Sequence, residues 1–232
     1  PSAILEFYRD LTEISGFELE TAGVLKGGRK IWALAKTGQS VALKGNDVTN
    51  GYILLATACD GTLATTAQFT SIRVVCNNTL AVALANGNRG VVKVPHNTSF
   101  DAQAVKKQLG ISVSAWDEFM YGLKNLSERK VKPAEAQNYV WRVFNDGSNK
   151  SSTSSSNERA MAKVMTLFEG GGQGADLSSA KGTAFGLLNS ITEFVDHERR
   201  ALNPDNRLDS AWFGQGAAIK QKALDEALLM IA

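Results

Sequence analysis

Strand-like runs of apolar and β-branched residues cluster in the first hundred positions of the chain, whereas after Phe100 the apolar residues recur every three to four positions. A period of two is typical of strands that bury one face, and a period of 3.6 is typical of amphipathic helices. We therefore expect an α+β fold. Its N-terminal antiparallel β-hairpins form a sheet that is backed by helices, and the C-terminal half is helical.

Two turn signals divide the strand-rich part into hairpins. Gly27-Gly28 joins two strand-like runs, and Asp60-Gly61 joins the runs Tyr52–Cys59 and Thr62–Val75. Such pairs accept the positive φ angles that tight hairpins require. If Lys26 pairs with Arg29, the first hairpin has a basic tip. One more strand is expected over residues 90–94, ended by Pro95.

The helical periodicity predicts several helices. In the N-terminal part they cover residues 1–16 and, as a short helix capped by Asn77 or Asn78, residues 77–86. In the remainder they cover residues 112–127, 133–145, 156–170, 178–200 and 210–232. Pro133 suits the first turn of its helix. We expect a helix-plus-sheet region at 1–99 and a helical region at 100–232, packed together as one domain.

The composition is ordinary for a globular protein. The chain has 232 residues, of which 44% are hydrophobic and 21% charged, enough to bury one sizeable core. No apolar run approaches the roughly 20 residues that cross a bilayer, so we expect no membrane span. The chain begins with Pro1 instead of Met, which we interpret as a fragment or a processed product.

Charge is unevenly distributed on a chain whose formal net charge is only +2. Residues 1–22 contain one Arg and five acids, residues 23–46 five cations and no acid, and residues 89–132 eight cations and four acids. Such segregation can produce a basic stripe on a nearly neutral protein. The alternative is that these charges lie on ordinary solvated faces.

Signals for catalysis, metals and cofactors are weak. Cys59 and Cys76 lie in strand-like runs without metal-ligand spacing, and we interpret them as free, buried thiols in a reducing cytosol. With two His and two Cys we expect no metal site and no cofactor. The glycine-rich segment 169–176 follows a helix and lacks the phosphate-loop order. No hydrolase or dinucleotide motif is present either, so we do not expect an enzyme.

One polar stripe lies in the predicted helix 178–200. Its members are Asn189, Glu193, Asp196, His197 and Arg200. We interpret the stripe as a solvated helix face with charge pairs, and contact with a partner or with DNA is the alternative.

The aromatic residues are expected mainly in the core. This applies to the four tryptophans, Trp32, Trp116, Trp141 and Trp212. Tyr52, Phe69 and Trp32 lie on strands near the basic hairpin tip, so they are the candidates for stacking on bases.

Four blocks of the sequence resemble a known family. They are "AGVLKGGRKIWALAK", "TSIRVVCNNTL", "TAFGLLNSITEFVDHERR" and "SAWFGQGAAIKQKAL". In this order they resemble the phage/plasmid-like proteins, the domain of unknown function 932, although Phe185 stands where that family commonly has Trp. The resemblance implies a protein of phages, plasmids and their bacterial hosts, located in the bacterial cytoplasm, without established catalytic residues. The order of elements is similar in outline to phage single-strand annealing proteins, which is an analogy of topology only.

Arg73 is a charge inside an apolar run, and two hypotheses address it. In the first, Arg73 projects from an open sheet face and binds a phosphate backbone together with other cations. The full candidate set is Lys26, Arg29, Lys30, Arg73, Arg89 and Lys93. In the second, Arg73 forms a buried or subunit-bridging pair with an acid such as Glu193 or Asp196, because an unpaired buried charge is too costly.

These expectations define two candidate functions. The first is a nucleic-acid-binding protein of a phage or plasmid, acting as an oligomer in the annealing or recombination of single-stranded DNA. The second is a non-catalytic structural or interaction module that self-assembles through sheet edges.

Overall fold

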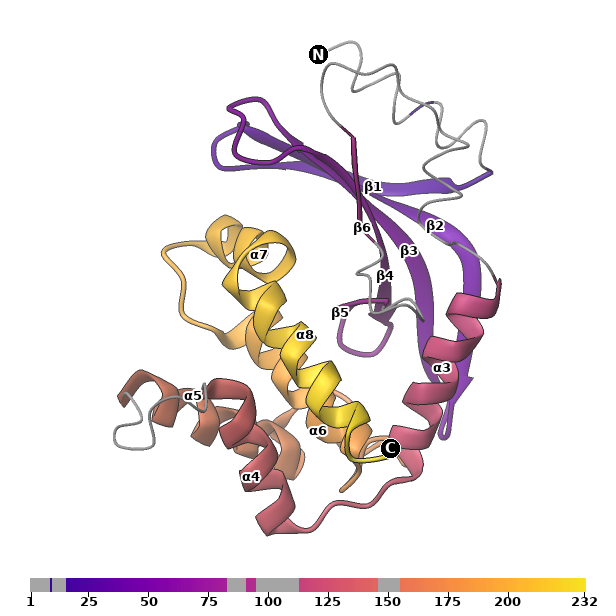
Figure 1. The fold of residues 1–232 in the computed structure, drawn as a ribbon, viewed down its shortest axis with the longest axis vertical. Helices are drawn as coiled ribbons and strands as arrows, with labels where there is room; N and C mark the ends of the chain where they lie inside the picture. The colour runs from indigo at the N-terminus through magenta and orange to yellow at the C-terminus, as the bar shows by residue number, and fades with distance from the viewer. Residues whose placement is uncertain (1–8, 10–15, 83–90, 95–112, 146–154) are drawn as a thin grey trace. The chain divides into compact units, whose positions relative to one another are not determined.

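The structure is a computed structural model that describes residue 9 and residues 16–82, 91–94, 113–145 and 155–232. The fold is α+β, as predicted: an antiparallel sheet occupies the N-terminal half, and the helices lie mostly in the C-terminal half (Figure 1). The predicted helix over residues 1–16 lies almost entirely outside the described residues. Within them, no helix is both long and apolar enough to cross a membrane.

The chain forms two compact units that alternate along the sequence. The first consists of Pro1–Val41, Thr49–Ile72 and Ala81–Met120, and the second of Ala42–Val48, Arg73–Leu80 and Tyr121–Ala232. The second unit therefore combines the helices with two short segments from the strand region. The predicted division between residues 99 and 100 falls outside the described residues and stays a prediction.

In the part of the chain that the structure describes, six strands form the sheet, in the order β1-β2-β3-β4-β5, and β6 also pairs with β4. The strands are β1 (Glu18–Leu25), β2 (Lys30–Leu43), β3 (Asp47–Ala58), β4 (Thr65–Arg73), β5 (Asn78–Ala81) and β6 (Val91–Val94). The strand predicted before Pro95 is thus confirmed as β6. The second predicted hairpin is confirmed as β3–β4.

The first hairpin has the predicted register near its turn. Leu25 lies opposite Lys30 and Gly23 opposite Trp32, as expected if Lys26 and Arg29 face each other. The register shifts between Leu19 and Thr21, which marks a β-bulge farther along the strand. Gly27 and Gly28 both have positive φ angles, of 63° and 87°, which the pair of glycines accepts without strain.

The helix predicted over residues 77–86 is wrong where the structure describes it. Asn77 has a φ of 54°, and its N–H donates to the carbonyl of Arg73, so the chain turns sharply after β4. The following residues pair back along β4, where the N–H of Val82 donates to the carbonyl of Phe69. Asparagine is among the few residues that enter this left-handed region readily, so Asn77 forms part of the turn between β4 and β5 instead of capping a helix.

The helices follow the predicted periodicity with two exceptions: the helix predicted over residues 178–200 begins only at Ala184, and the helix predicted over residues 210–232 is divided. The helices are α3 (Val113–Glu128), α4 (Pro133–Phe144), α5 (Ser155–Thr166), η1 (Leu167–Gly171), α6 (Ala184–Glu193), η2 (Phe194–Glu198), α7 (Pro204–Phe213) and α8 (Gln215–Leu228). The segments η1 and η2 are wider π-helical turns that continue α5 and α6. The single helix predicted over residues 210–232 is wrong, because Gly214 has non-helical dihedrals, with φ −121° and ψ −147°, and separates α7 from α8.

Each unit has its own core. In the first, Trp116 packs against Phe69 at 5.7 Å between ring centroids and lies where a side chain at Gly51 would be. In the second, every residue of α6 is buried, and α6 runs beside α8 (Figure 1). The hydroxyl of Tyr139 on α4 donates to the carbonyl of Ala223 on α8 at 2.7 Å, which connects those two helices.

Candidate functional site

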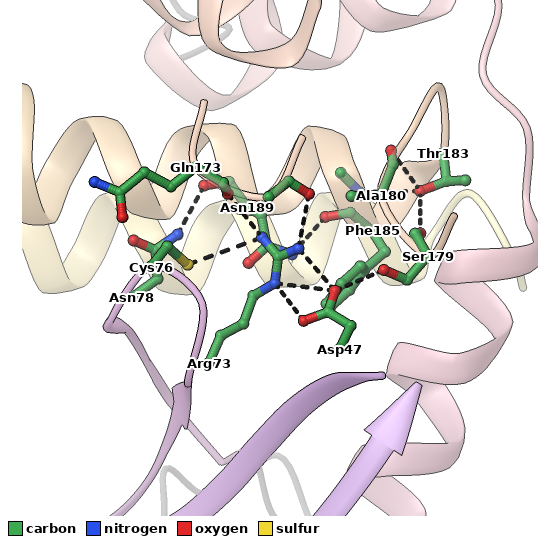
Figure 2. Close-up of polar contacts among 12 residues, drawn as sticks. Asp47, Arg73, Cys76, Asn78, Gln173, Ser179, Ala180, Thr183, Phe185 and Asn189 are labelled. Atoms are coloured by element: carbon green, nitrogen blue, oxygen red, sulfur yellow. Dashed lines mark hydrogen bonds and ion pairs between the residues drawn. The ribbon is translucent and has the colours of Figure 1, made fainter. Parts of the chain in front are cut away.

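Arg73 lies at the end of β4 beside Asp47, the first residue of β3, and the two form a buried ion pair (Figure 2). Nε of Arg73 donates to Oδ1 of Asp47 at 2.8 Å, and Nη2 donates to Oδ2 at 2.7 Å. The Arg73 and Asp47 side chains are 4% and 0% exposed. The expectation that Arg73 projects from an open face is therefore wrong. The hypothesis of a buried pair is confirmed, although the acid is Asp47 and not Glu193 or Asp196.

The rest of the guanidinium is also enclosed (Figure 2). Nη2 donates to the carbonyl of Gly174 at 3.0 Å, and Nη1 lies 3.4 Å from the carbonyl of Gln173. The ring of Phe185 lies under the guanidinium, 5.3 Å from its centroid. Burial works to lower the pKa of Arg73, but the hydrogen bonds to Asp47 and the interactions with Asp47 and Cys76 together outweigh it, so the pKa is raised.

Asp47 has a second partner that completes its hydrogen bonding. The hydroxyl of Ser179 donates to Oδ2 of Asp47 at 2.6 Å, and Ser179 is fully buried. Asp47, Arg73, Ser179 and Phe185, with the carbonyls of residues 173 and 174, form what we call the Arg73 cluster. Buried charges are tolerated when paired and fully hydrogen-bonded, and this cluster meets that condition.

The glycine-rich segment after η1 wraps closely around the Arg73 cluster. A Cβ atom at Gly174, where φ is 69°, would lie 3.0 Å from Nη2 of Arg73 and 2.8 Å from a methyl group of Val75. A Cβ atom at Gly172 would lie 2.9 Å from a carboxylate oxygen of Glu193. These two glycines allow the backbone to approach buried charged side chains.

The polar stripe on α6 and η2 is largely enclosed, so its interpretation as a solvated face is wrong. Asn189 and Glu193 are buried, and both carboxylate oxygens of Glu193 accept from the N–H of Gln173, at 3.0 and 3.1 Å. His197 is exposed, yet its Nε2 lies 3.0 Å from the carbonyl of Cys76. Arg200 is exposed.

Asp196, another member of the stripe, forms a separate buried set of hydrogen bonds. Its Oδ2 accepts from the N–H of Thr79 at 2.7 Å, and its Oδ1 accepts from Nζ of Lys220 at 2.7 Å. Lys220 also donates to the hydroxyl of Thr79 at 2.7 Å, and the Lys220 and Asp196 side chains are each 6% exposed. We call Thr79, Asp196 and Lys220 the Lys220 triad. It holds β5, η2 and α8 together.

The thiol of Cys76 has low reactivity in this environment. Burial raises the pKa of its thiol to about 11, although the neighbouring Arg73 works in the opposite direction. A neutral thiol is a poor nucleophile at neutral pH. Cys59, in contrast, is exposed, so the expectation of two buried thiols is wrong for this residue; both are free.

The remaining candidate cations belong to the first unit, apart from Arg89, which lies outside the described residues. Lys26, Arg29 and Lys30 form the cationic tip of the β1–β2 hairpin. Arg29 is exposed, its Nε donates to the carbonyl of Lys26 at 3.0 Å, and Asp60 lies 4.0 Å from its Nη1. Lys26 and Lys30 are partly exposed.

Lys93 lies at the same end of the sheet as the cationic tip. The carbonyl of Arg29 accepts from the N–H of Cys59 at 2.8 Å, which places the tip beside the turn between β3 and β4. Lys93 is exposed on β6 opposite Thr66, the second residue of β4. Three strand spacings of about 4.8 Å therefore separate the tip from Lys93, or about 14 Å.

The candidate stacking residues are mostly inaccessible. Tyr52 is 6% and Phe69 0% exposed, so they are core residues, while Trp32 is partly exposed. The prediction that all four tryptophans pack in the core is wrong for Trp141, which is 37% exposed.

Asp47 is the residue that sequence reasoning missed. It follows Lys44-Gly45-Asn46, where Gly45 and Asn46 have φ angles of 77° and 58° and form the turn between β2 and β3. A Gly-Asn pair between strand-like runs is a turn signal, and it would have placed Asp47 at the start of a strand. Its pairing with Arg73 depends on strand order, which no local pattern reveals.

The structure defines an α+β protein whose buried charged side chains are paired with one another, as in Arg73 with Asp47 and Lys220 with Asp196. The chain belongs to the family described as the domain of unknown function DUF932, whose family model matches residues 1–212. This match confirms the family resemblance. Lys220 lies beyond the matched residues. No curated protein and no solved structure matches the chain.

Proposed function

We propose that this protein binds nucleic acid through the cationic tip and Lys93, as a phage or plasmid protein that acts on single-stranded DNA. The observation that supports the proposal is the grouping of three cations within five residues at one hairpin end, with a fourth cation at the same end of the sheet. Lysine and arginine side chains bind phosphates by neutralising charge and releasing counterions.

Arg73 takes no part in this proposed interface. Its guanidinium is committed to Asp47, to two carbonyls and to the ring of Phe185, so it has no donor to offer to a phosphate on the surface. The proposal therefore separates the cations of the chain into structural ones, such as Arg73 and Lys220, and surface ones at the hairpin tip.

The test is a titration of a fluorescein-labelled oligo(dT) strand with protein, followed by fluorescence anisotropy at low salt. The tip variant, K26Q/R29Q/K30Q, is expected to bind at least about tenfold more weakly, since each lost phosphate contact removes a charge-assisted interaction. The matched control, K124Q/K132Q/K181Q, removes three exposed charges from the second unit and is expected to retain the affinity. Equal affinities of the two variants would contradict the proposal.

A second candidate function, self-assembly through sheet edges, is favoured by β1. This strand is at one end of the strand order, and its Leu19 and Val24 are 48% and 59% exposed. Exposed apolar edge strands pair readily with other strands, and a lysine on the edge suppresses such pairing. Val24→Lys is therefore expected to lower the molar mass measured by light scattering. An unchanged molar mass would exclude assembly through this edge.

A further inference from the structure

Three arginines meet where η2, α7 and the start of α8 come together in the second unit. Arg199 follows η2, Arg200 is next to it, and Arg207 lies on α7. The Nε of Arg207 donates to the backbone carbonyl of Arg199 at 2.9 Å, which brings the two residues together. We call these three residues the arginine corner.

Arg199 is the partly buried member, and both partners of its side chain are neutral. Its Nη1 donates to the hydroxyl of Ser210 at 3.0 Å, and its Nη2 donates to the side-chain carbonyl of Gln215 at 2.5 Å. Ser210 Oγ also accepts from the N–H of Gly216, so the hydroxyl is held in place at the α7–α8 corner. Burial lowers the pKa of Arg199, and no acid offsets that effect.

The acids nearby are directed elsewhere. Glu198 pairs with Lys163 at 3.2 Å. Asp205 and Asp209 lie on α7 two residues before and after Arg207, which at 100° per residue puts them on the opposite side of that helix. The side chains of Arg199 and Arg207 donate to a hydroxyl, an amide oxygen and a backbone carbonyl, which are neutral groups. The corner thus concentrates three positive charges, and the contacts that hold Arg199 and Arg207 in place come from neutral groups.

We infer that the arginine corner binds a phosphate group, supplied either by a nucleic-acid backbone or by a small phosphorylated ligand. A guanidinium presents a planar fork of donors that matches phosphate oxygens. Arg200 is exposed, and Arg207 is partly exposed with its Nε at the backbone carbonyl of Arg199. A bound phosphate would supply the negative charge that the burial of Arg199 leaves uncompensated.

This site does not depend on the cationic tip, because the tip belongs to the first unit and the arginine corner to the second. It also gives a role to the end of the "VDHERR" block, whose Asp196 is committed to the Lys220 triad while Arg200 faces solvent.

Calorimetric titration with pyrophosphate and anisotropy with labelled oligo(dT) test the inference on the same variants. R200Q/R207Q removes two charges and leaves the Arg199 contacts with Ser210 and Gln215 in place. The control R142Q/R159Q removes two charges from α4 and α5. The corner variant is expected to bind at least one of the two probes about tenfold more weakly than the control does.

Each outcome has a defined meaning. Weakened pyrophosphate binding with unchanged oligonucleotide binding supports a small phosphorylated ligand, and weakened oligonucleotide binding supports a nucleic-acid backbone. If the corner variant and its control bind both probes equally, or if wild-type protein binds neither probe, the inference is overturned. The proposed function can fail while this inference holds. In that case the tip variant and its control bind oligo(dT) equally, whereas the corner variant still binds a probe more weakly than its own control does.

Discussion

At the scale of single residues, the main result is that Arg73, the charge inside the apolar strand, has a structural role. Arg73 and Asp47 are both almost fully buried, and each makes several hydrogen bonds beyond the pair itself. Burying such a pair gains little net stability, whereas removing one partner leaves an uncompensated charge in the interior. The pair therefore makes the structure intolerant of single substitutions at either position.

Arg73→Met is expected to lower the free energy of unfolding by about 3–5 kcal/mol, because Asp47 then remains buried without its cation. Urea denaturation measures this change. The matched control is Arg142→Met, which breaks an exposed ion pair with Glu226 and should cost about 1 kcal/mol or less. The double variant Asp47→Leu with Arg73→Met should recover part of the loss. A cost for Arg73→Met equal to that of the control would contradict the structural role.

The two cysteines are expected to differ in reactivity. Cys59 is exposed and Cys76 is 2% exposed, with a thiol pKa of about 11. Under native conditions at pH 8, N-ethylmaleimide should modify Cys59 rapidly and Cys76 only after unfolding, as followed by mass spectrometry. Cys59→Ser should then show almost no native-state labelling. Rapid labelling of Cys76 in that variant would show that the thiol is accessible.

The raised pKa of Cys76 also predicts a dependence of stability on pH. An unfolded thiol ionises near pH 8.5, whereas the folded one stays neutral until about pH 11. The folded state therefore holds more protons in this window, so the contribution is complete below about pH 8.5 and is lost as the pH rises to about 11. Cys76→Ala should reduce the loss of stability between these values in urea titrations.

At the scale of elements, the glycine-rich segment illustrates how composition alone misleads. Its glycines admit the backbone to the Arg73 cluster and to Glu193, and two of them would place a Cβ atom within 3.0 Å of another residue's atoms there. These positions require glycine because the backbone there passes close to charged side chains of the same chain, and not because it binds a phosphate. The same composition in front of a helix after a strand would instead suggest a phosphate loop.

Gly174→Ala is expected to destabilise the protein more than Gly182→Ala. Both glycines have similar positive φ angles, of 69° and 65°, so both substitutions incur the left-handed cost of about 1–2 kcal/mol. A Cβ atom at Gly182 meets nothing within 4 Å, whereas one at Gly174 meets Val75 and Arg73. The additional overpacking should cost about 1–3 kcal/mol in urea denaturation. Equal costs would show that the segment does not pack tightly on Arg73.

Sequence periodicity predicted most of the helices and strands. Local chemistry separates the elements that were predicted from those that were missed. The Gly27-Gly28 and Asp60-Gly61 hairpins and the helix begun by Pro133 follow from local turn and cap chemistry, which acts over a few residues. The strand after Asn77 and the break at Gly214 do not, because each depends on what the chain packs against. The interpretation of the α6–η2 stripe as a solvated face was wrong for the same reason. Its polar residues form hydrogen bonds with Thr79, Gln173 and Lys220, which are distant in sequence.

At the scale of the whole molecule, the positive charges fall into groups with different surroundings. Arg73 and Lys220 are enclosed with acids, whereas the cationic tip and Lys93 are at least partly exposed at one end of the sheet. The sequence predicted which residues are cationic, but not this division. That division needs the positions of Asp47 and Asp196, which only the folded chain brings to their partners.

The most direct test of this division is the salt dependence of oligo(dT) binding. A plot of the logarithm of the association constant against the logarithm of the salt concentration has a slope of about −0.7 per neutralised phosphate of a single strand. We predict a clear negative slope for the wild-type protein, and a slope for K26Q/R29Q/K30Q that is less negative by about 2, from three removed contacts. Identical slopes for the two proteins, or a flat wild-type plot, would contradict the assignment of the cationic tip to nucleic-acid binding.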